Sequence, residues 1–288
     1  MELIIRNLNK TYGNGLQAIK NVNLIIKQGM FGLLGPNGAG KSSLMRTIAT
    51  LQEADTGQIT LGELNVLTQK EEVRQILGYL PQEFGVYPKV SAEDLLTHFA
   101  VLKGIINRRE REEIVKVLLQ KTNLYGDRKK NLGGYSGGMK QRFGIAQALL
   151  ANPKLIIVDE PTAGLDPAER NRFLNLLSEI GENTIVILST HIVDDVKELC
   201  ADMAIINKGE VLYQGSPDNA IAEIRGRVWR RRVPKSELEN YRSTHMVISD
   251  KLVGGTPVIH VLADVQPEGF EPVEADLEDV YFGKIHGL

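Results

Sequence analysis

The feature that most constrains this chain is a glycine-rich run between a short apolar segment and a segment of helical character. The run is Gly35-Pro36-Asn37-Gly38-Ala39-Gly40-Lys41-Ser42, it follows Met30–Leu34, and it fits the pattern G-x-x-x-x-G-K-[ST]. Glycines let the backbone curl so that successive N–H groups point at phosphate oxygens, and a helix N-terminus adds a favourable dipole. The run therefore predicts a strand, a phosphate-binding loop and a helix over about residues 41–51.

The last residues of this loop indicate how it would bind a nucleotide. Lys41 would place its cation on the β- and γ-phosphates and assist catalysis, and the Ser42 hydroxyl would bind Mg²⁺. We expect every residue of the run, together with the adjacent Ser43, to contact the nucleotide. By itself the loop predicts a P-loop NTPase and does not choose among GTPases, kinases, helicases and transporters.

Two adjacent carboxylates form a second candidate feature. Asp159 and Glu160 follow Leu155–Val158, which has the composition of a buried parallel strand. Such a strand would deliver both carboxylates to the sheet edge where α/β folds bind ligands, with the side chains pointing in opposite directions. Asp159 would then hold Mg²⁺, directly or through water, and Glu160 would orient and deprotonate an attacking water. The alternative is a strand that simply runs into an acidic turn.

The apolar periodicity around these motifs predicts an α/β fold. Residues 1–30 have the alternation of antiparallel strands, and an α/β pattern resumes at residue 155. Asp166, Pro167 and Glu169 suit the N-cap, N1 and N3 positions of a helix that Gly181 would end. The other elements expected in this part are strands at 155–158, 184–188, 203–206 and 210–213 and a helix at about 192–200.

Residues 84–152 are predicted to form a mostly helical subdomain inserted into this core. A capping box begins at Ser91, a second helix covers about 109–124 and a third about 138–150. The side chains expected to face inwards are Leu95, Phe99, Leu102 and Ile106 in the first helix and Ile114, Val117 and Leu118 in the second.

The pattern of apolar and polar residues changes after Gly215. We therefore expect one domain over 1–215 and a small α/β accessory domain over 216–288. Strands are predicted at 227–233, 246–252 and 258–262, and helices at 236–242 and 276–282. The first part of this accessory domain carries an arginine cluster: Arg225, Arg227, Arg230, Arg231 and Arg232. It is interpreted either as a solvated strand face or as a contact with a partner or with anionic lipid headgroups.

Composition excludes several function classes. The formal net charge is −2, so there is no electrostatic case for nucleic-acid or general membrane binding. Cys200 is the single cysteine, which rules out an intrachain disulfide and disfavours a cysteine zinc site. No apolar run approaches the roughly 20 residues that span a bilayer, and the first ten residues lack the features of a signal peptide.

A third motif resembles the signature of the ABC-family ATPases. It is Tyr135-Ser136-Gly137-Gly138-Met139-Lys140-Gln141-Arg142, with Tyr135 and Met139 in place of the usual Leu and Gln. Both replacements resemble variants of exporter-type members. The Ser-Gly-Gly core at a helix N-terminus would be a second phosphate-binding device. The resemblance implies an ABC-type core, with a mixed sheet and an antiparallel β subdomain, and ATP with Mg²⁺ as ligands. It also implies a head-to-tail dimer in which Ser136, Gly137 and Gly138 contact the ATP of the other copy.

Four further positions match the family one by one. Tyr12 is similar to the aromatic that stacks on adenine, and Gln82 to the glutamine that senses Mg²⁺ and water. Ala163-Gly164-Leu165-Asp166 resembles the loop that crosses the dimer interface, so Asp166 is expected near ATP. His191 resembles the switch histidine near the γ-phosphate and Glu160, so we expect it to be catalytic. The resemblance covers about residues 1–215.

The function implied is an ATP-hydrolysing subunit of an ABC transporter. It would act as a homodimer, or a heterodimer with a related ATPase, on a separate transmembrane permease at the cytoplasmic face of the cell membrane. Residues 274–282 resemble the C-terminal stretch of exporter ATPases. Phe84, Val86, Tyr87, Leu95 and Leu96 would line a groove for a permease helix or belong to the core. The alternatives are a soluble ABC ATPase acting on ribosomes, DNA or cofactor assembly, and a regulatory module without catalysis.

Overall fold

The strand that leads into the phosphate loop lies inside a six-stranded mixed sheet. The computed structural model describes residues 1–82, 85, 87–162 and 164–287. The order of this sheet is β10-β9-β3-β8-β7-β6, and only β10 is antiparallel to its neighbour. The strands are β3 (Gly29–Leu34), β6 (Leu77–Leu80), β7 (Leu155–Asp159), β8 (Ile185–Thr190), β9 (Asp202–Asn207) and β10 (Glu210–Gly215). The predicted mixed sheet is confirmed.

A second, antiparallel sheet covers one side of this core. Its order is β2-β1-β4-β5, from β1 (Glu2–Thr11), β2 (Gln17–Lys27), β4 (Thr56–Leu61) and β5 (Leu64–Asn65). Helix α1 (Lys41–Ile48) packs with both sheets through one apolar cluster that contains Leu24, Phe31 and Leu44. The alternation in residues 1–30 therefore predicted β1 and β2 correctly, whereas β4, β5 and α2 (Lys70–Gln75) were not predicted.

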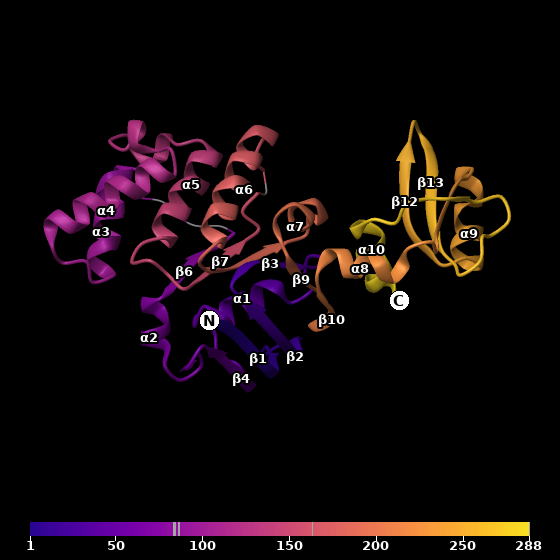
Figure 1. Ribbon diagram of the computed structural model, residues 1–288, viewed down its shortest axis with the longest axis horizontal. Helices are drawn as coiled ribbons and strands as arrows, with labels where there is room; N and C mark the ends of the chain where they lie inside the picture. Colours follow the sequence, from indigo (N-terminus) through magenta and orange to yellow (C-terminus); the bar gives the residue numbers. More distant parts are fainter. Residues whose placement is uncertain (83–84, 86, 163, 288) are drawn as a thin grey trace.

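The helical subdomain forms one end of the molecule (Figure 1). It contains α3 (Ala92–Leu102), α4 (Arg108–Lys121) and α5 (Gly137–Ala148), with 3₁₀ turns η1 (Tyr125–Asp127) and η2 (Leu132–Gly134). Ser91 caps α3, because its Oγ accepts a hydrogen bond from the Asp94 N–H at 3.1 Å. The Asp94 carboxylate accepts from the Ser91 hydroxyl at 2.6 Å, so the predicted cap is confirmed but its reciprocal backbone bond is replaced by a side-chain contact.

Three side chains predicted to face inwards in this subdomain are exposed. Leu102, Ile106 and Val117 are 67%, 80% and 48% exposed, respectively. Helix α3 ends at Leu102, so Ile106 lies outside the helical repeat on which the prediction depended. In α4 the buried stripe is Val115, Leu118 and Leu119, which are spaced by three and four residues, and Val117 therefore lies off that face.

The other side of the mixed sheet is covered by α6 (Pro167–Gly181) and α7 (Val193–Leu199). The capping prediction for α6 is confirmed: the Asp166 carboxylate accepts from the Glu169 N–H at 2.9 Å, Pro167 occupies the first turn and Gly181 is the last residue. The burial of Phe173, Leu177 and Val196 among the sheet residues fixes these helices against β3, β7 and β8.

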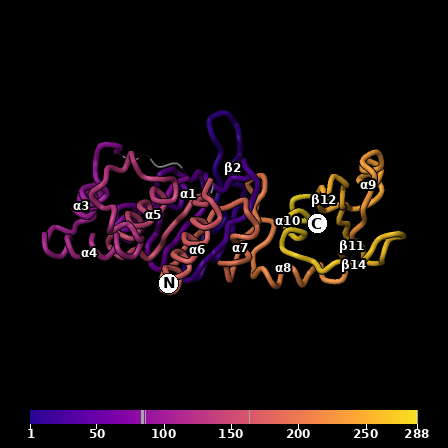
Figure 2. Tube along the Cα trace, turned by 90° about the horizontal axis from the view of Figure 1, so that it is seen from above, coloured from indigo at the N-terminus to yellow at the C-terminus, as the bar shows by residue number. Residues whose placement is uncertain are grey.

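The C-terminal residues form a third sheet at the opposite end from α3 and α4 (Figures 1 and 2). Its order is β12-β13-β11-β14, from β11 (Val228–Arg232), β12 (Val247–Val253), β13 (Thr256–Leu262) and β14 (Glu271–Pro272). The helical elements here are α8 (Pro217–Ile224), η3 (Lys235–Glu237), α9 (Leu238–Thr244) and α10 (Leu277–His286). Val280 and Tyr281 of α10 share an apolar cluster with Val196 and Met203, so the predicted boundary at 215 crosses a common core and stays a prediction.

Two arginines of the cluster form ion pairs in the C-terminal region. Arg227 pairs with Asp264 at 2.7 Å and Arg230 with Glu271 at 2.8 Å. The Arg231 guanidinium lies over the rings of Tyr241 and Phe270. These pairings favour the interpretation of a solvated strand face. No helix among residues 1–82, 87–162 and 164–287 is long and apolar enough to span a membrane.

Candidate functional site

The phosphate loop joins the end of β3 to the start of α1, as the sequence predicts. Two of its glycines are required by close packing. A Cβ at Gly35 would lie 2.4 Å from the Ile206 carbonyl oxygen, and one at Gly40 would lie 2.3 Å from the Ala18 carbonyl oxygen. Gly40 also has φ +105°, a conformation that other residues rarely adopt. The loop is therefore held against β2 and β9 by contacts that only glycine permits.

Lys41 is buried at the first position of α1. Its Nζ donates to the carbonyl oxygens of Gly35 at 2.6 Å and Pro36 at 3.1 Å, and lies 3.4 Å from Oε1 of Glu160. Burial lowers the pKa of Lys41, and the Glu160 carboxylate opposes that shift. The ammonium group is thus held inside the curve of the loop, where phosphate oxygens would meet it.

Asp159 ends strand β7 with its carboxylate buried. Burial raises the pKa of Asp159, and the hydroxyls of Ser189 and Ser42 oppose the shift. Its Oδ1 has no hydrogen-bond partner among the described residues. A buried carboxylate oxygen without a donor is destabilising unless a cation or a donor binds it. Asp159 and Ser42 therefore fit a Mg²⁺ ion, which prefers a few carboxylate and hydroxyl oxygens beside phosphate oxygens.

The two carboxylates do have different surroundings, but strand alternation, which was the predicted reason, is not the cause. Strand β7 ends at Asp159, and Glu160 adopts φ +46°, in the left-handed region. The Glu160 N–H donates to the Ser189 carbonyl at 2.8 Å, which holds this conformation against β8. A non-glycine residue in that region is strained, and the surrounding sheet supports it.

The Glu160 carboxylate lies at the centre of the predicted catalytic residues. Its Oε2 accepts a hydrogen bond from Nε2 of Gln82 at 3.2 Å and lies 3.3 Å from Nδ1 of His191. With Lys41 at the other oxygen, three predicted site residues from three separate segments meet one carboxylate. The chain therefore brings Lys41, Gln82, Glu160 and His191 together without any ligand.

A cavity of about 650 Å³ opens beside the phosphate loop. The predicted site residues that line it are Tyr12, Pro36, Asn37, Gly38, Gly40, Lys41, Ser42, Ser43, Gln82 and Glu160. The Tyr12 hydroxyl bonds with Ser43 Oγ at 2.9 Å and donates to Gln52 Oε1 at 2.8 Å, so the ring is anchored to α1. Lys20 and Lys208 also line the cavity and were not predicted, because neither belongs to a recognisable motif.

The signature residues and Asp166 do not line this cavity. Ser136 caps α5 by accepting from the Met139 N–H at 3.2 Å, and Gly137 has open space around it. A Cβ at Gly138 would lie 2.5 Å from Oε2 of Glu169, so the Glu169 side chain on α6 would have to shift to admit one. Ala163, in the loop before Asp166, lies outside the described residues. Within one chain the two motifs predicted to bind phosphate therefore do not share this cavity.

The family is decided by a comparison with protein-family models. Residues 19–163 match the model described as ABC transporter. The chain belongs to the ABC transporter family. It is an ATP-binding protein and ATPase of that family.

Relatives and solved structures agree with the family. An ABC transporter ATP-binding protein of Bacillus subtilis, YxlF, is 34% identical over 99% of this ABC chain and 99% of its own. The linearmycin resistance ATP-binding protein LnrL of Bacillus subtilis is 34% identical over 76% of this chain and 71% of its own. A dimeric ATP-binding cassette in a post-hydrolysis state, bound to ADP and Pi, covers 74% of this chain and 98% of its own with a TM-score of 0.68 and 27% identity.

Proposed function

We propose that two copies of this chain, or one copy and a related ATPase, hydrolyse ATP in a head-to-tail dimer. The observation that carries this proposal is the separation of the two phosphate-binding devices within one chain. Ser136 and Gly137 are exposed at the N-terminus of α5 and do not line the P-loop cavity. A second copy could present them to that cavity, and the dimeric arrangement of the ADP-bound neighbour supports this geometry.

The chemistry we infer places Glu160 as the general base. Its carboxylate accepts a proton from the water that attacks the γ-phosphate, and Gln82 and His191 hold that carboxylate in place. Lys41 binds the β- and γ-phosphates from inside the loop. Mg²⁺, held by Asp159, Ser42 and Gln82, would neutralise charge on the phosphates when bound. We infer that Tyr12, which also lines this cavity, stacks on adenine.

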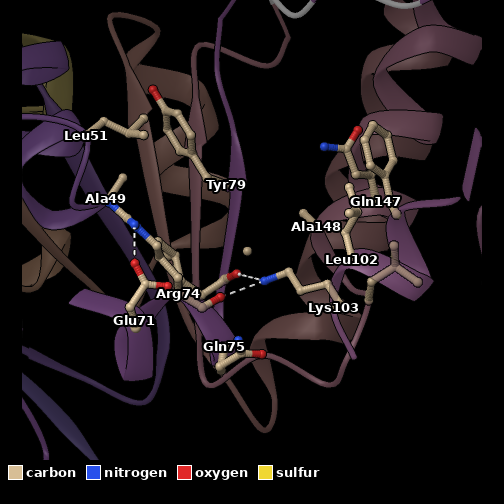
Figure 3. Close-up of a pocket in the computed structure, with 14 residues that line it drawn as sticks. Ala49, Leu51, Glu71, Arg74, Gln75, Tyr79, Leu102, Lys103, Gln147 and Ala148 are labelled. Carbon is tan, nitrogen blue, oxygen red and sulfur yellow. Dashed lines mark hydrogen bonds and ion pairs between the residues drawn. The ribbon is translucent and has the colours of Figure 1, made fainter. Parts of the chain in front are cut away.

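We further infer that the ATPase acts on a separate transmembrane permease. A second cavity of about 430 Å³ lies at the junction of the mixed sheet and the helical subdomain (Figure 3). Apolar side chains form much of its wall, and Leu51 and Leu102 are strongly exposed there. Lys103 spans the cavity floor by donating to the carbonyls of Arg74 at 2.7 Å and Leu77 at 2.9 Å. An apolar groove with exposed leucines suits an amphipathic helix of a permease.

For Leu95 and Leu96 the core alternative predicted from sequence is confirmed, so the proposed groove lies elsewhere. Leu95 and Leu96 are buried in the core of the helical subdomain, because they face Leu118 and Leu119 of α4 within one apolar cluster. Tyr87 is exposed, and Phe84 and Val86 lie outside the described residues. Leu51 and Leu102 are therefore the leucines that we assign to the permease contact.

The transport direction that we propose is export, at the cytoplasmic face of the cell membrane. It is supported by the C-terminal stretch at 274–282 and by a relative whose name describes linearmycin resistance. Copurification of a multi-span membrane protein with the tagged chain would support the transporter assignment. Copurification with ribosomes and without a membrane protein would instead favour a soluble ABC ATPase.

The dimer and the base are tested together with Glu160→Gln. This variant keeps the P-loop and the Gln82 contact but removes the proton acceptor, so ATP should hold the dimer closed. We expect a stable dimer by gel filtration with ATP and Mg²⁺, and loss of ATP hydrolysis by about 100-fold or more. Hydrolysis at the wild-type rate would show that Glu160 is not the base.

A further inference from the structure

Asp195 is a fully buried carboxylate that belongs to none of the motifs recognised in the sequence. It lies in the first turn of α7, four residues after His191, and has no exposed surface. A buried carboxylate is costly unless charges or hydrogen bonds compensate it. The partners of Asp195 therefore indicate why an acid occupies this position.

Three side chains converge on Asp195. Its Oδ2 accepts a hydrogen bond from Thr162 Oγ1 at 2.7 Å and a longer one from Thr190 Oγ1 at 3.4 Å. Its Oδ1 accepts from Nε of Arg170 at 2.8 Å and lies 2.5 Å from Nη2 of the same guanidinium. Both carboxylate oxygens are thus used, and each threonine hydroxyl is also buried.

Each partner comes from a different part of the proposed catalytic site. Thr162 follows Glu160 by two residues, and Thr190 directly precedes His191. Arg170 lies in the first turns of α6, where its N–H donates to the Asp166 carbonyl at 2.9 Å. Asp195 consequently contacts the loop after Glu160, the residue before His191 and the helix that Asp166 begins.

We propose that Asp195 is a positioning residue, which holds Glu160, His191 and Asp166 at fixed distances from one another through Thr162, Thr190 and Arg170. This inference rests on the proposed roles of Glu160 and His191. The separation of 3.3 Å between His191 Nδ1 and Glu160 Oε2 depends on two loops that come from different strands, β7 and β8. The Thr162 and Thr190 hydroxyls tie the loop after β7 and the end of β8 to one carboxylate, which a purely structural ion pair with Arg170 would not require.

The test uses the full chain and the variants Thr162→Val and Asp195→Asn. Thr162→Val keeps the Arg170–Asp195 pair. It therefore still tests the proposal if Asp195→Asn folds poorly because its guanidinium partner is uncompensated. We expect both variants to lower kcat on the order of 10- to 100-fold while Kd for ATP changes less than about 3-fold, because small misplacements of catalytic groups act on the chemical step. Asp194→Asn is the matched control: this neighbour is exposed, and its kcat should remain at the wild-type value.

A double variant, Asp195→Leu with Arg170→Met, separates positioning from folding. It removes both charges together, so a purely structural pair could be replaced without loss of kcat. The proposal predicts that the double variant melts cooperatively but has a low kcat. It also predicts that the single variant Asp195→Glu, which keeps the carboxylate, has a kcat between those of Asp195→Asn and the wild type. Wild-type kcat in folded Thr162→Val or in the double variant would overturn it. If Glu160→Gln abolishes hydrolysis in that case, the proposed function stands; if Glu160→Gln is fully active, the proposed function itself fails.

Discussion

Nδ1 of His191 lies 3.3 Å from Oε2 of Glu160, although the two residues follow different strands of the mixed sheet. Strands β7 and β8 are parallel neighbours, so their carboxyl ends release both residues at the same edge. This contact makes His191 a direct test of the site. We expect His191→Ala to retain ATP binding and to lower kcat on the order of 100-fold.

The measurement for His191 is steady-state hydrolysis beside equilibrium binding of a fluorescent ATP analogue. His98→Ala provides the control, because His98 lies in α3 of the helical subdomain and does not line the nucleotide cavity. Equal kcat values for His191→Ala and the wild type would exclude a catalytic role for the imidazole.

Tyr12 tests the adenine end of the cavity. Tyr12→Ala removes the ring, and we expect Kd for ATP to rise at least about 5-fold, since stacking of a base on an aromatic ring contributes roughly 1–3 kcal/mol. Tyr12→Phe keeps the ring but loses the hydroxyl contacts with Ser43 and Gln52, so its Kd should stay nearer to wild type. Isothermal titration calorimetry of the three proteins measures the difference. An unchanged Kd in Tyr12→Ala would remove Tyr12 from the binding site.

Leu102 tests the groove proposed for the permease. Leu102→Asp places a charge in the wall of the 430 Å³ cavity, while the exposed position should keep stability within about 0.5 kcal/mol of wild type. We expect loss of permease copurification with basal ATPase activity preserved. Val117→Asp is the matched control, because Val117 is an exposed helical residue outside that cavity. Retention of the permease by Leu102→Asp, or equal loss in both variants, would argue against this groove.

Cys200 offers a probe of folding. Burial, with a further contribution from Asp195, raises the pKa of the Cys200 thiol from 9.0 to about 12. The native thiol should therefore resist alkylation by iodoacetamide at pH 8 and react in denaturant. Mass spectrometry measures the alkylation. Rapid modification of the native protein would contradict the buried position of Cys200.

The same shift predicts a pH dependence of stability. The folded state holds the thiol proton more tightly than the unfolded state does. The contribution of Cys200 to the free energy of unfolding is therefore complete below pH 9 and is lost as pH rises from 9 towards 12. The free energy of unfolding should fall more steeply in wild type than in Cys200→Ala over that range, by up to about 1.4 kcal/mol per pH unit. Parallel curves from urea unfolding at pH 8 to 10.5 would show that the thiol does not contribute.

The motifs were predictable because each depends on neighbours in sequence. The phosphate loop, the Ser91 and Asp166 caps and the strand before Asp159 are encoded by residues within a few positions of one another. Periodicity was less reliable at the surface: Leu102, Ile106 and Val117 fit an apolar pattern but are exposed, because hydrophobic residues also occupy protein surfaces.

The sequence alone determined a glycine-rich P-loop, a carboxylate pair and a second motif that is predicted to bind phosphate, since local spacing specifies turns and helix starts. Only the tertiary structure decided that Lys41, Gln82, Glu160 and His191 meet, and that Asp195 lies among Thr162, Thr190 and Arg170. The reason is the strand order β3-β8-β7-β6, which places the ends of segments far apart in the chain at one edge of the sheet. No local pattern encodes that order, because it follows from packing of the whole core.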